Sequence, residues 1–64
     1  MKNAIMFKRA LPKRDGWCWE VEIYEDEKQI DARCFHYYSG KGCIEAIDYA
    51  RAWDKNWTLN LGKY

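Results

Sequence analysis

The alternation of apolar and polar positions is clearest in residues 17–24 (WCWEVEIY), where an apolar side chain occupies every second position. This period predicts a β-strand, because successive side chains of a strand point to opposite faces. One face of this strand carries Trp17, Trp19, Val21 and Ile23, and the other carries Cys18, Glu20, Glu22 and Tyr24. The pattern therefore predicts a strand with an apolar side and an acidic side.

Two further segments predict strands next to this one. Residues 3–11 (NAIMFKRAL) end at Pro12, and the following PKRDG is typical of a turn. Residues 29–38 follow a turn at residues 25–28 that contains no glycine, and SGKG then interrupts the pattern. Residues 58–61 are a short candidate for a last strand.

A helix is predicted for residues 43–56. The apolar positions recur at helical spacing, while the charged residues between them face away. The apolar stripe consists of Cys43, Ala46, Ile47, Ala50, Trp53 and Trp57. Ser39 is a candidate N-cap for this helix. Together the segments predict an α+β fold (β-β-β-α): an antiparallel sheet of three strands, or four with residues 58–61, with one helix packed on one face.

The helix can cover only one face of so small a sheet, and the other face is the candidate binding surface. The register that turns Ile30, Ala32 and Cys34 inward is favoured, because a shift by one residue would bury Asp31 and Arg33 instead. The open face then combines acidic and aromatic side chains: Glu20, Glu22, Tyr24, Arg33, Phe35 and Tyr37. Aromatic residues and arginine are favoured at protein interfaces, and glutamates attract basic partners.

The 64 residues are enough for one domain with a thin core, to which four tryptophans and five tyrosines contribute large buried areas. The net charge is only +1, but it is segregated. Residues 1–14 carry five basic and no acidic residues, whereas residues 15–31 carry seven acidic residues and one lysine. An acidic middle segment disfavours phosphate binding there, because nucleic acids repel carboxylates.

No apolar run approaches the roughly 20 residues of a membrane span, and the N-terminus lacks the pattern of a signal peptide. Three cysteines, an odd number, are more typical of a reducing compartment than of a disulfide framework. We therefore expect a cytoplasmic protein without a membrane partner.

Catalytic and metal-binding motifs are weak. Cys18, Cys34, His36 and Cys43 could supply a zinc site, but they form no CxxC pair, and parity places Cys18 on the face opposite Cys34. His36 has no evident orienting group for a Cys–His pair, and SGKG lacks the full GxxxxGK[ST] pattern of a phosphate loop. We expect no enzyme, no metal and no cofactor, with reduced cysteines acting as small apolar residues.

The stretch YEDEKQIDAR, followed after six residues by GK, resembles a segment of small phage-encoded type I-F anti-CRISPR proteins. It covers about eighteen of the 64 residues, and NAIMFKRAL is similar to the basic, aromatic first strand of that family. The resemblance implies a non-enzymatic inhibitor whose sheet binds backbone subunits of the RNA-guided surveillance complex and blocks access to target DNA. Tyr24 matches a strand tyrosine of the family, and Phe7 matches a first-strand aromatic residue. Phe35 occupies a position that is acidic in the family, so one expected contact is altered.

The order of three strands and one helix is also similar to AP2-like and integrase arm-type DNA-binding modules. The segments DGWCWEVEIYEDEKQIDARCF and EAIDYARAW are similar in their residue pattern to those domains. Those modules read DNA with strands that should carry arginine and lysine, whereas this sheet face carries Glu20, Glu22 and Asp31. Only Arg33 and the basic N-terminal segment fit DNA binding, so direct nucleic-acid binding is not favoured.

The sequence therefore predicts a small binding protein of a phage or mobile element, acting in the host cytoplasm as an inhibitor of a defence complex. Its expected partner is a basic protein surface, such as that of a host nucleic-acid-binding protein. Glu20 and Glu22 would pair with basic side chains of the partner, and Tyr24, Phe35 and Tyr37 would anchor the contact. Two alternatives stay open: a DNA-binding module, and a self-associating module that forms a homodimer through the exposed sheet face.

Overall fold

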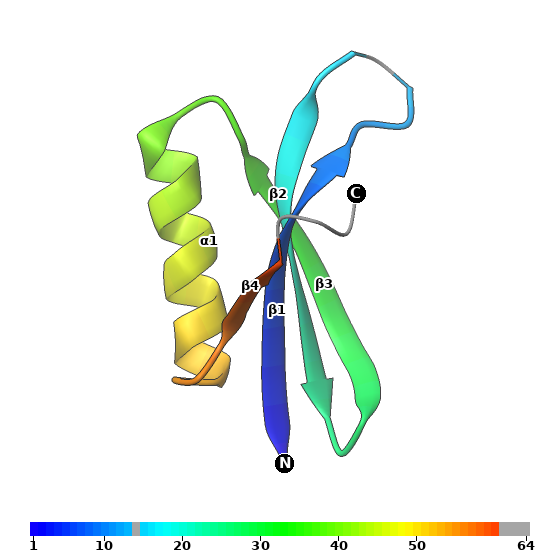
Figure 1. Ribbon diagram of the computed structural model, residues 1–64, viewed down its shortest axis with the longest axis vertical. Coiled ribbons are helices and arrows are strands. Elements are labelled where there is room, and N and C mark those ends of the chain that lie inside the picture. Colours follow the sequence, from blue (N-terminus) through cyan, green and yellow to red (C-terminus); the bar gives the residue numbers. More distant parts are fainter. Residues whose placement is uncertain (14, 61–64) are drawn as a thin grey trace.

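The computed structural model describes residues 1–13 and 15–60, and this part of the chain forms a four-stranded sheet and one helix. In chain order the elements are β1 (Lys2–Ala10), β2 (Trp17–Glu25), β3 (Lys28–His36), α1 (Gly40–Trp53) and β4 (Thr58–Asn60). The strand order in the sheet is β3-β2-β1-β4, and α1 packs across β1, β2 and β3 on one side (Figure 1). The expected α+β fold with a single helix on the sheet is confirmed.

The sheet is mixed rather than purely antiparallel. β1, β2 and β3 form the expected antiparallel meander, but β4 runs parallel to β1 and pairs only with residues 5–7. A parallel neighbour needs a long crossover, and the helix provides it by carrying the chain from the β3 edge of the sheet to the β1 edge. The predicted fourth strand is confirmed for residues 58–60, and Leu61 lies outside the described residues.

Helix α1 begins three residues before its predicted start and ends three residues before its predicted end. Ser39 is the N-cap: its side-chain oxygen accepts a hydrogen bond from the Gly42 N–H at 3.0 Å, which confirms the candidate cap. The first turn approaches the end of β3 so closely that a Cβ on Gly42 would lie 2.0 Å from the His36 carbonyl oxygen. The glycines that indicated a break in the pattern therefore belong to the helix.

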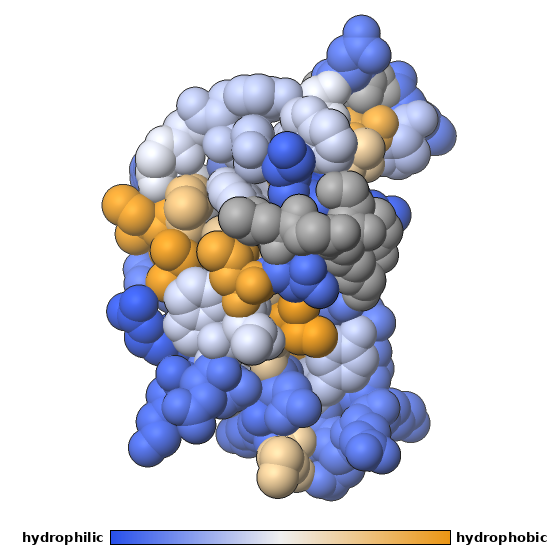
Figure 2. Space-filling model, in the orientation of Figure 1, coloured by the Kyte–Doolittle hydropathy of each residue, from blue (hydrophilic) through white to orange (hydrophobic). Residues whose placement is uncertain are grey.

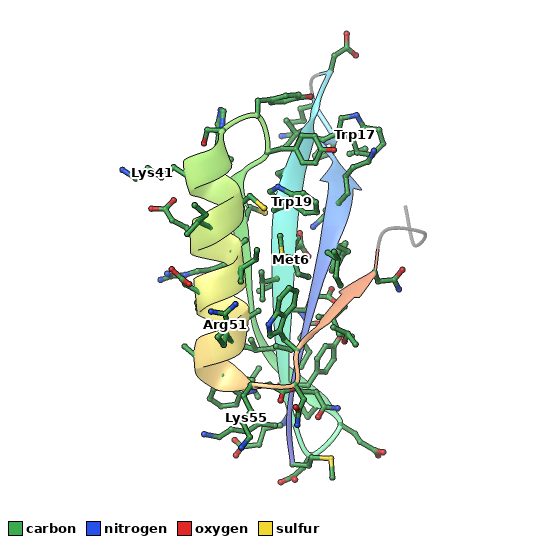
Figure 3. The ribbon with its side chains drawn as sticks, turned by 60° about the vertical axis from the view of Figure 1, so that its left-hand side comes forward. Met6, Trp17, Trp19, Lys41, Arg51 and Lys55 are labelled. Atoms are coloured by element: carbon green, nitrogen blue, oxygen red, sulfur yellow. The ribbon has the colours of Figure 1, made fainter. Side chains whose placement is uncertain are left out.

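The core lies between α1 and the sheet. Ala46 and Ala50 of the helix pack on four buried residues of β1 and β2, namely Ala4, Met6, Val21 and Ile23. Trp19, Trp53 and Trp57 pack around this cluster as predicted, and Figure 3 shows Met6 and Trp19 on the side of the sheet that faces α1. Trp17 lies outside the cluster and is half-buried. Small alanines let the helix approach the sheet, and the tryptophans fill the periphery.

The face assignment of β3 differs from the expected one because of a bulge. Asp26 and Glu27 both adopt positive φ angles (54° and 69°), which makes a two-residue hairpin with Glu25 opposite Lys28. That register alone would have placed alternate β3 residues as predicted. However, the register shifts after Tyr24, so that Ile30 is an extra residue in β3. One extra residue turns every later β3 side chain to the other face.

As a result, Asp31 and Arg33 lie on the helix side of the sheet, opposite Ile23 and Val21, and the predicted register is wrong. This register was not expected, because burying two charged side chains would be costly. That cost does not arise, because β3 is an edge strand and both residues remain exposed. Ala32 and Cys34 lie instead on the face without the helix, and both are exposed.

Candidate binding surface

Glu20 is buried, contrary to the expected exposure. It lies between Phe7 and Cys34 on the face of the sheet opposite the helix, and only 4% of the residue is exposed. Its carboxylate accepts hydrogen bonds from the Arg9 guanidinium and, at 3.6 Å, from the Cys34 thiol. The hydrogen bond and charge of Glu20 raise the pKa of Arg9. The charge of Glu20 is therefore compensated within the chain rather than presented to a partner.

Glu22 and Tyr24 lie on the helix-free face, as predicted, and both are half-buried. The Tyr24 hydroxyl donates a hydrogen bond to the Glu22 carboxylate at 2.9 Å. The Tyr24 carbonyl oxygen accepts a hydrogen bond from the Trp53 indole N–H at 2.8 Å, which ties the end of β2 to the end of α1. Tyrosine and glutamate therefore form a fixed pair beside the β2–β3 hairpin.

Arg33, Phe35 and Tyr37 are on the other side of the sheet. The Phe35 ring lies 5.7 Å from the Tyr49 ring of α1, and the Arg33 guanidinium carbon lies 5.2 Å from the same ring. Tyr37 contacts Trp19, with 4.9 Å between the ring centroids. The six predicted site residues consequently do not share one surface: three lie on the helix-free face and three on the helix side.

A groove of about 640 Å³ lies at the β1 edge of the sheet, because β4 pairs with β1 only at residues 5–7. We call it the Tyr24 groove; it is lined by Tyr24, Glu27, Asp54, Asn56, Thr58 and the first five residues of the chain. Residues of the N-terminus and the β2–β3 hairpin, at the lower end of Figure 1, form a mainly hydrophilic surface in Figure 2. The groove thus combines one aromatic ring with two carboxylates from different elements.

The two positively charged groups that line the Tyr24 groove, the Lys2 side chain and the N-terminal amine, have partners within the chain. The Lys2 ammonium lies 4.4 Å from the centre of the Trp53 ring, and the N-terminal amine forms an ion pair with Asp26. Asp54 accepts a hydrogen bond from the Asn56 backbone N–H at 2.9 Å. Sequence reasoning missed this groove, because it depends on the parallel β4 strand and on the loop that precedes it.

A second groove, of about 520 Å³, lies at the opposite end of the sheet and is mainly aromatic. We call it the Trp17 groove; it is lined by Leu11, Asp15, Trp17, Cys18, Cys34, Phe35, His36, Tyr37 and Tyr38. The Tyr38 hydroxyl accepts a hydrogen bond from the Trp17 N–H at 3.0 Å, and the Lys8 ammonium lies 4.4 Å from the Trp17 ring. The signal in the sequence was the YY pair after β3, which an antiparallel hairpin brings next to the start of β2.

Cys18 and Cys34 lie on the same face of the sheet, so the parity argument that separated them is wrong. Although Cys34 is exposed overall, partial desolvation of its thiol, together with the neighbouring Cys18 and Glu20 side chains, raises the pKa of Cys34 to about 11. Cys34 is therefore a neutral thiol near pH 7. Among the described residues, no group of three or more cysteine, histidine, aspartate or glutamate side chains is placed to hold a metal ion.

In comparisons with known proteins, the chain matches no family model, no curated protein and no solved structure. Within the described ranges, no helix has both the length and the apolar character required to cross a membrane.

Proposed function

We propose that this chain is a non-enzymatic binding protein that takes a basic side chain of a protein partner into the Tyr24 groove. The observation that carries this proposal is the convergence of Tyr24, Glu27 and Asp54 on one groove from three separate parts of the chain. A lysine or arginine of the partner would lie against the aromatic ring and near the carboxylates, which combines a cation–π contact with charge-assisted hydrogen bonds.

The partner class follows from the resemblance of residues 24–41 to type I-F anti-CRISPR proteins, in which Tyr24 matches a strand tyrosine. We propose a surveillance-type defence complex of the host as the target, and a phage or mobile element as the source of the chain. Proteins that hold RNA carry lysine and arginine on the surfaces that contact phosphates, so they offer the basic side chains that an acidic groove would attract. The host cytoplasm is the corresponding location.

The test measures target-DNA binding by a purified type I-F surveillance complex as the chain is added. Wild-type protein should reduce DNA binding and co-elute with the complex, whereas the Tyr24→Ala/Glu27→Lys double variant, which changes two residues of the groove, should do neither. Asp48→Lys is the control, because Asp48 is an exposed acidic residue on α1 outside the groove, and it should inhibit as wild type does. Inhibition by the double variant at wild-type concentrations would exclude the groove, and no effect of the wild type would exclude this partner.

The contacts of three basic side chains in the N-terminal segment do not favour direct nucleic-acid binding. Lys2 lies over Trp53, Lys8 lies over Trp17, and Arg9 is paired with buried Glu20. We therefore expect no binding to duplex DNA even at low salt. A titration at two salt concentrations checks this, because phosphate contacts would produce affinity that falls steeply as salt is added.

A further inference from the structure

The outer edge of β3 is the feature from which we draw a further inference. β3 is the outermost strand of the sheet, nine residues long, and all of its residues except Phe35 are exposed. Among the described residues, no strand pairs with its outer side. An uncovered edge of this length is a template for pairing with another strand, and proteins normally protect such edges.

The order of side chains along this edge is self-complementary about Ala32. If a second copy of β3 lies antiparallel with Ala32 opposite Ala32, Asp31 faces Arg33 of the second copy, and the reverse contact forms as well. Opposite charges across a strand pair are stabilising. Centring the pairing one residue away would place Asp31 opposite Asp31 or Arg33 opposite Arg33, which is unfavourable. The charges therefore select one register.

The remaining pairs in this register are compatible with contact. Ile30, an apolar residue that is 47% exposed, faces Cys34 of the second copy. The two residues are exposed in the single chain and would be partly covered in the pair. The bulge at Ile30 limits regular pairing to residues 30–34, so the contact is short.

The main-chain groups of Ala32 are oriented for such a contact. The Ala32 N–H donates a hydrogen bond to the Asp31 carboxylate at 2.8 Å. Because this N–H bonds to a side chain, we infer that it points to the outer edge of the sheet and not to β2. Alternate residues of a strand direct their hydrogen-bonding groups to the same edge. Ala32 would then form about two main-chain hydrogen bonds with Ala32 of the second copy, and Cys34 directs its main-chain groups to the same edge.

Both charged side chains are held on the same face of the sheet by one residue of the helix. The Tyr49 hydroxyl donates a hydrogen bond to Asp31 at 2.9 Å, and the Arg33 guanidinium lies over the Tyr49 ring. A two-fold axis perpendicular to the sheet places this face of both copies on the same side of the joined sheet. Each Asp31 therefore meets an Arg33 on its own side of the joined sheet.

We propose that two copies of this chain form a symmetric homodimer by antiparallel pairing of their β3 edges about Ala32. In the dimer, the Ala32 N–H exchanges the Asp31 carboxylate for the Ala32 carbonyl oxygen of the second copy. The carboxylate that this exchange releases pairs with Arg33 across the interface. Asp31 thus caps the edge in the single chain and holds the partner in the dimer. Residues 30–34 of β3 do not line the Tyr24 groove, so this proposal stands apart from the proposed function.

The dimer should be weak, because a strand pair alone buries less area than a standard protein interface. Sedimentation equilibrium over micromolar to millimolar concentrations measures it directly. The mass should rise from 7.7 kDa toward twice that value as concentration increases. Hydrogen exchange at the Ala32 and Cys34 amides should slow over the same concentration range.

Charge reversal tests the register. Asp31→Arg alone and Arg33→Asp alone each create two like-charge contacts and should weaken the dimer at least tenfold. The double variant should regain dimerisation, and an equimolar mixture of the two single variants should form a heterodimer, which also shows that each variant is folded. Asp48→Arg is the matched control on the exposed side of α1 and should dimerise as wild type does.

Three outcomes would overturn the proposal. The first is a mass of one chain at every concentration. The second is a dimer that neither single reversal weakens, and the third is a loss of dimer in the single variants that neither the double variant nor the mixture repairs. None of these outcomes bears on the Tyr24 groove, whose test uses different residues and a different readout.

Discussion

Replacing Gly42 with alanine should destabilise the fold, although alanine is the better helix-forming residue. The added Cβ would lie 2.0 Å from the His36 carbonyl oxygen and 2.8 Å from its carbonyl carbon. Both atoms belong to the backbone, so the helix itself has to move away from β3. Overpacking of this kind destabilises a fold by about 3 kcal/mol at the upper end of its usual range. The higher helix propensity of alanine relative to glycine offsets about 1 kcal/mol of this loss. The free energy of unfolding should therefore fall by about 2 kcal/mol.

Gly40 provides the control, because it lies two residues earlier in the same helix and a Cβ there would meet no atom within 4 Å. Gly40→Ala should raise the free energy of unfolding by about 0.5 kcal/mol through the loss of chain entropy in the unfolded state. In a domain of this size, 1 kcal/mol shifts the Tm by about 4–8 °C. Gly42→Ala should lower the Tm by about 8–16 °C, and Gly40→Ala should raise it slightly.

Urea unfolding followed by tryptophan fluorescence, with thermal unfolding by circular dichroism, measures both variants. Both should retain the secondary structure of the wild type at low temperature. The reasoning is refuted if Gly42→Ala is as stable as the wild type, or if the two alanine variants shift stability by the same amount. Either result would mean that the first turn of α1 does not contact the end of β3 as closely as described.

Three further predictions concern the ion pair, the hairpin and the thiol. Arg9→Met should lower the Tm by leaving buried Glu20 without its cation, and adding Glu20→Met should restore most of the loss. Asp26→Asn with Glu27→Gly should raise the free energy of unfolding by about 1 kcal/mol in urea, because both positions have positive φ; no gain would exclude strain in this turn. Because the pKa of Cys34 is about 11, its alkylation by iodoacetamide at pH 8 should be about 10-fold slower than that of an ordinary thiol, since the smaller thiolate fraction outweighs the higher nucleophilicity of that thiolate. The difference should shrink as the pH approaches 11, and fast alkylation at pH 8 would contradict it.

The alternation of residues 17–24 was sufficient to predict β2 and its apolar face. Trp19, Val21 and Ile23 do face the helix, because a central strand must bury one side and the pattern leaves only one choice. The helical stripe likewise predicted Ala46 and Ala50 as core residues. These features depend on the spacing of apolar residues between near neighbours in the chain, and this spacing can be read directly from a single sequence.

The candidate site was less predictable. Tyr24 and Glu22 were placed correctly, but the sequence carries no clear signal for the bulge that moves Arg33 and Phe35 to the helix side. The hairpin turn also lacks the glycine that normally identifies a two-residue type I′ turn. Glu20 looked like a surface glutamate, since its burial depends on Arg9, eleven residues away in the chain.

Local side-chain pattern thus determined the kind and order of the elements and the buried faces of β2 and α1. Long-range packing decided the rest: the direction of β4, the faces of β3, the burial of Glu20 and the position of the Tyr24 groove. The physical reason is that period and propensity act between near neighbours in the chain. In contrast, a one-residue bulge, an ion pair across strands and a parallel crossover depend on free energies summed over residues that only the folded chain brings together.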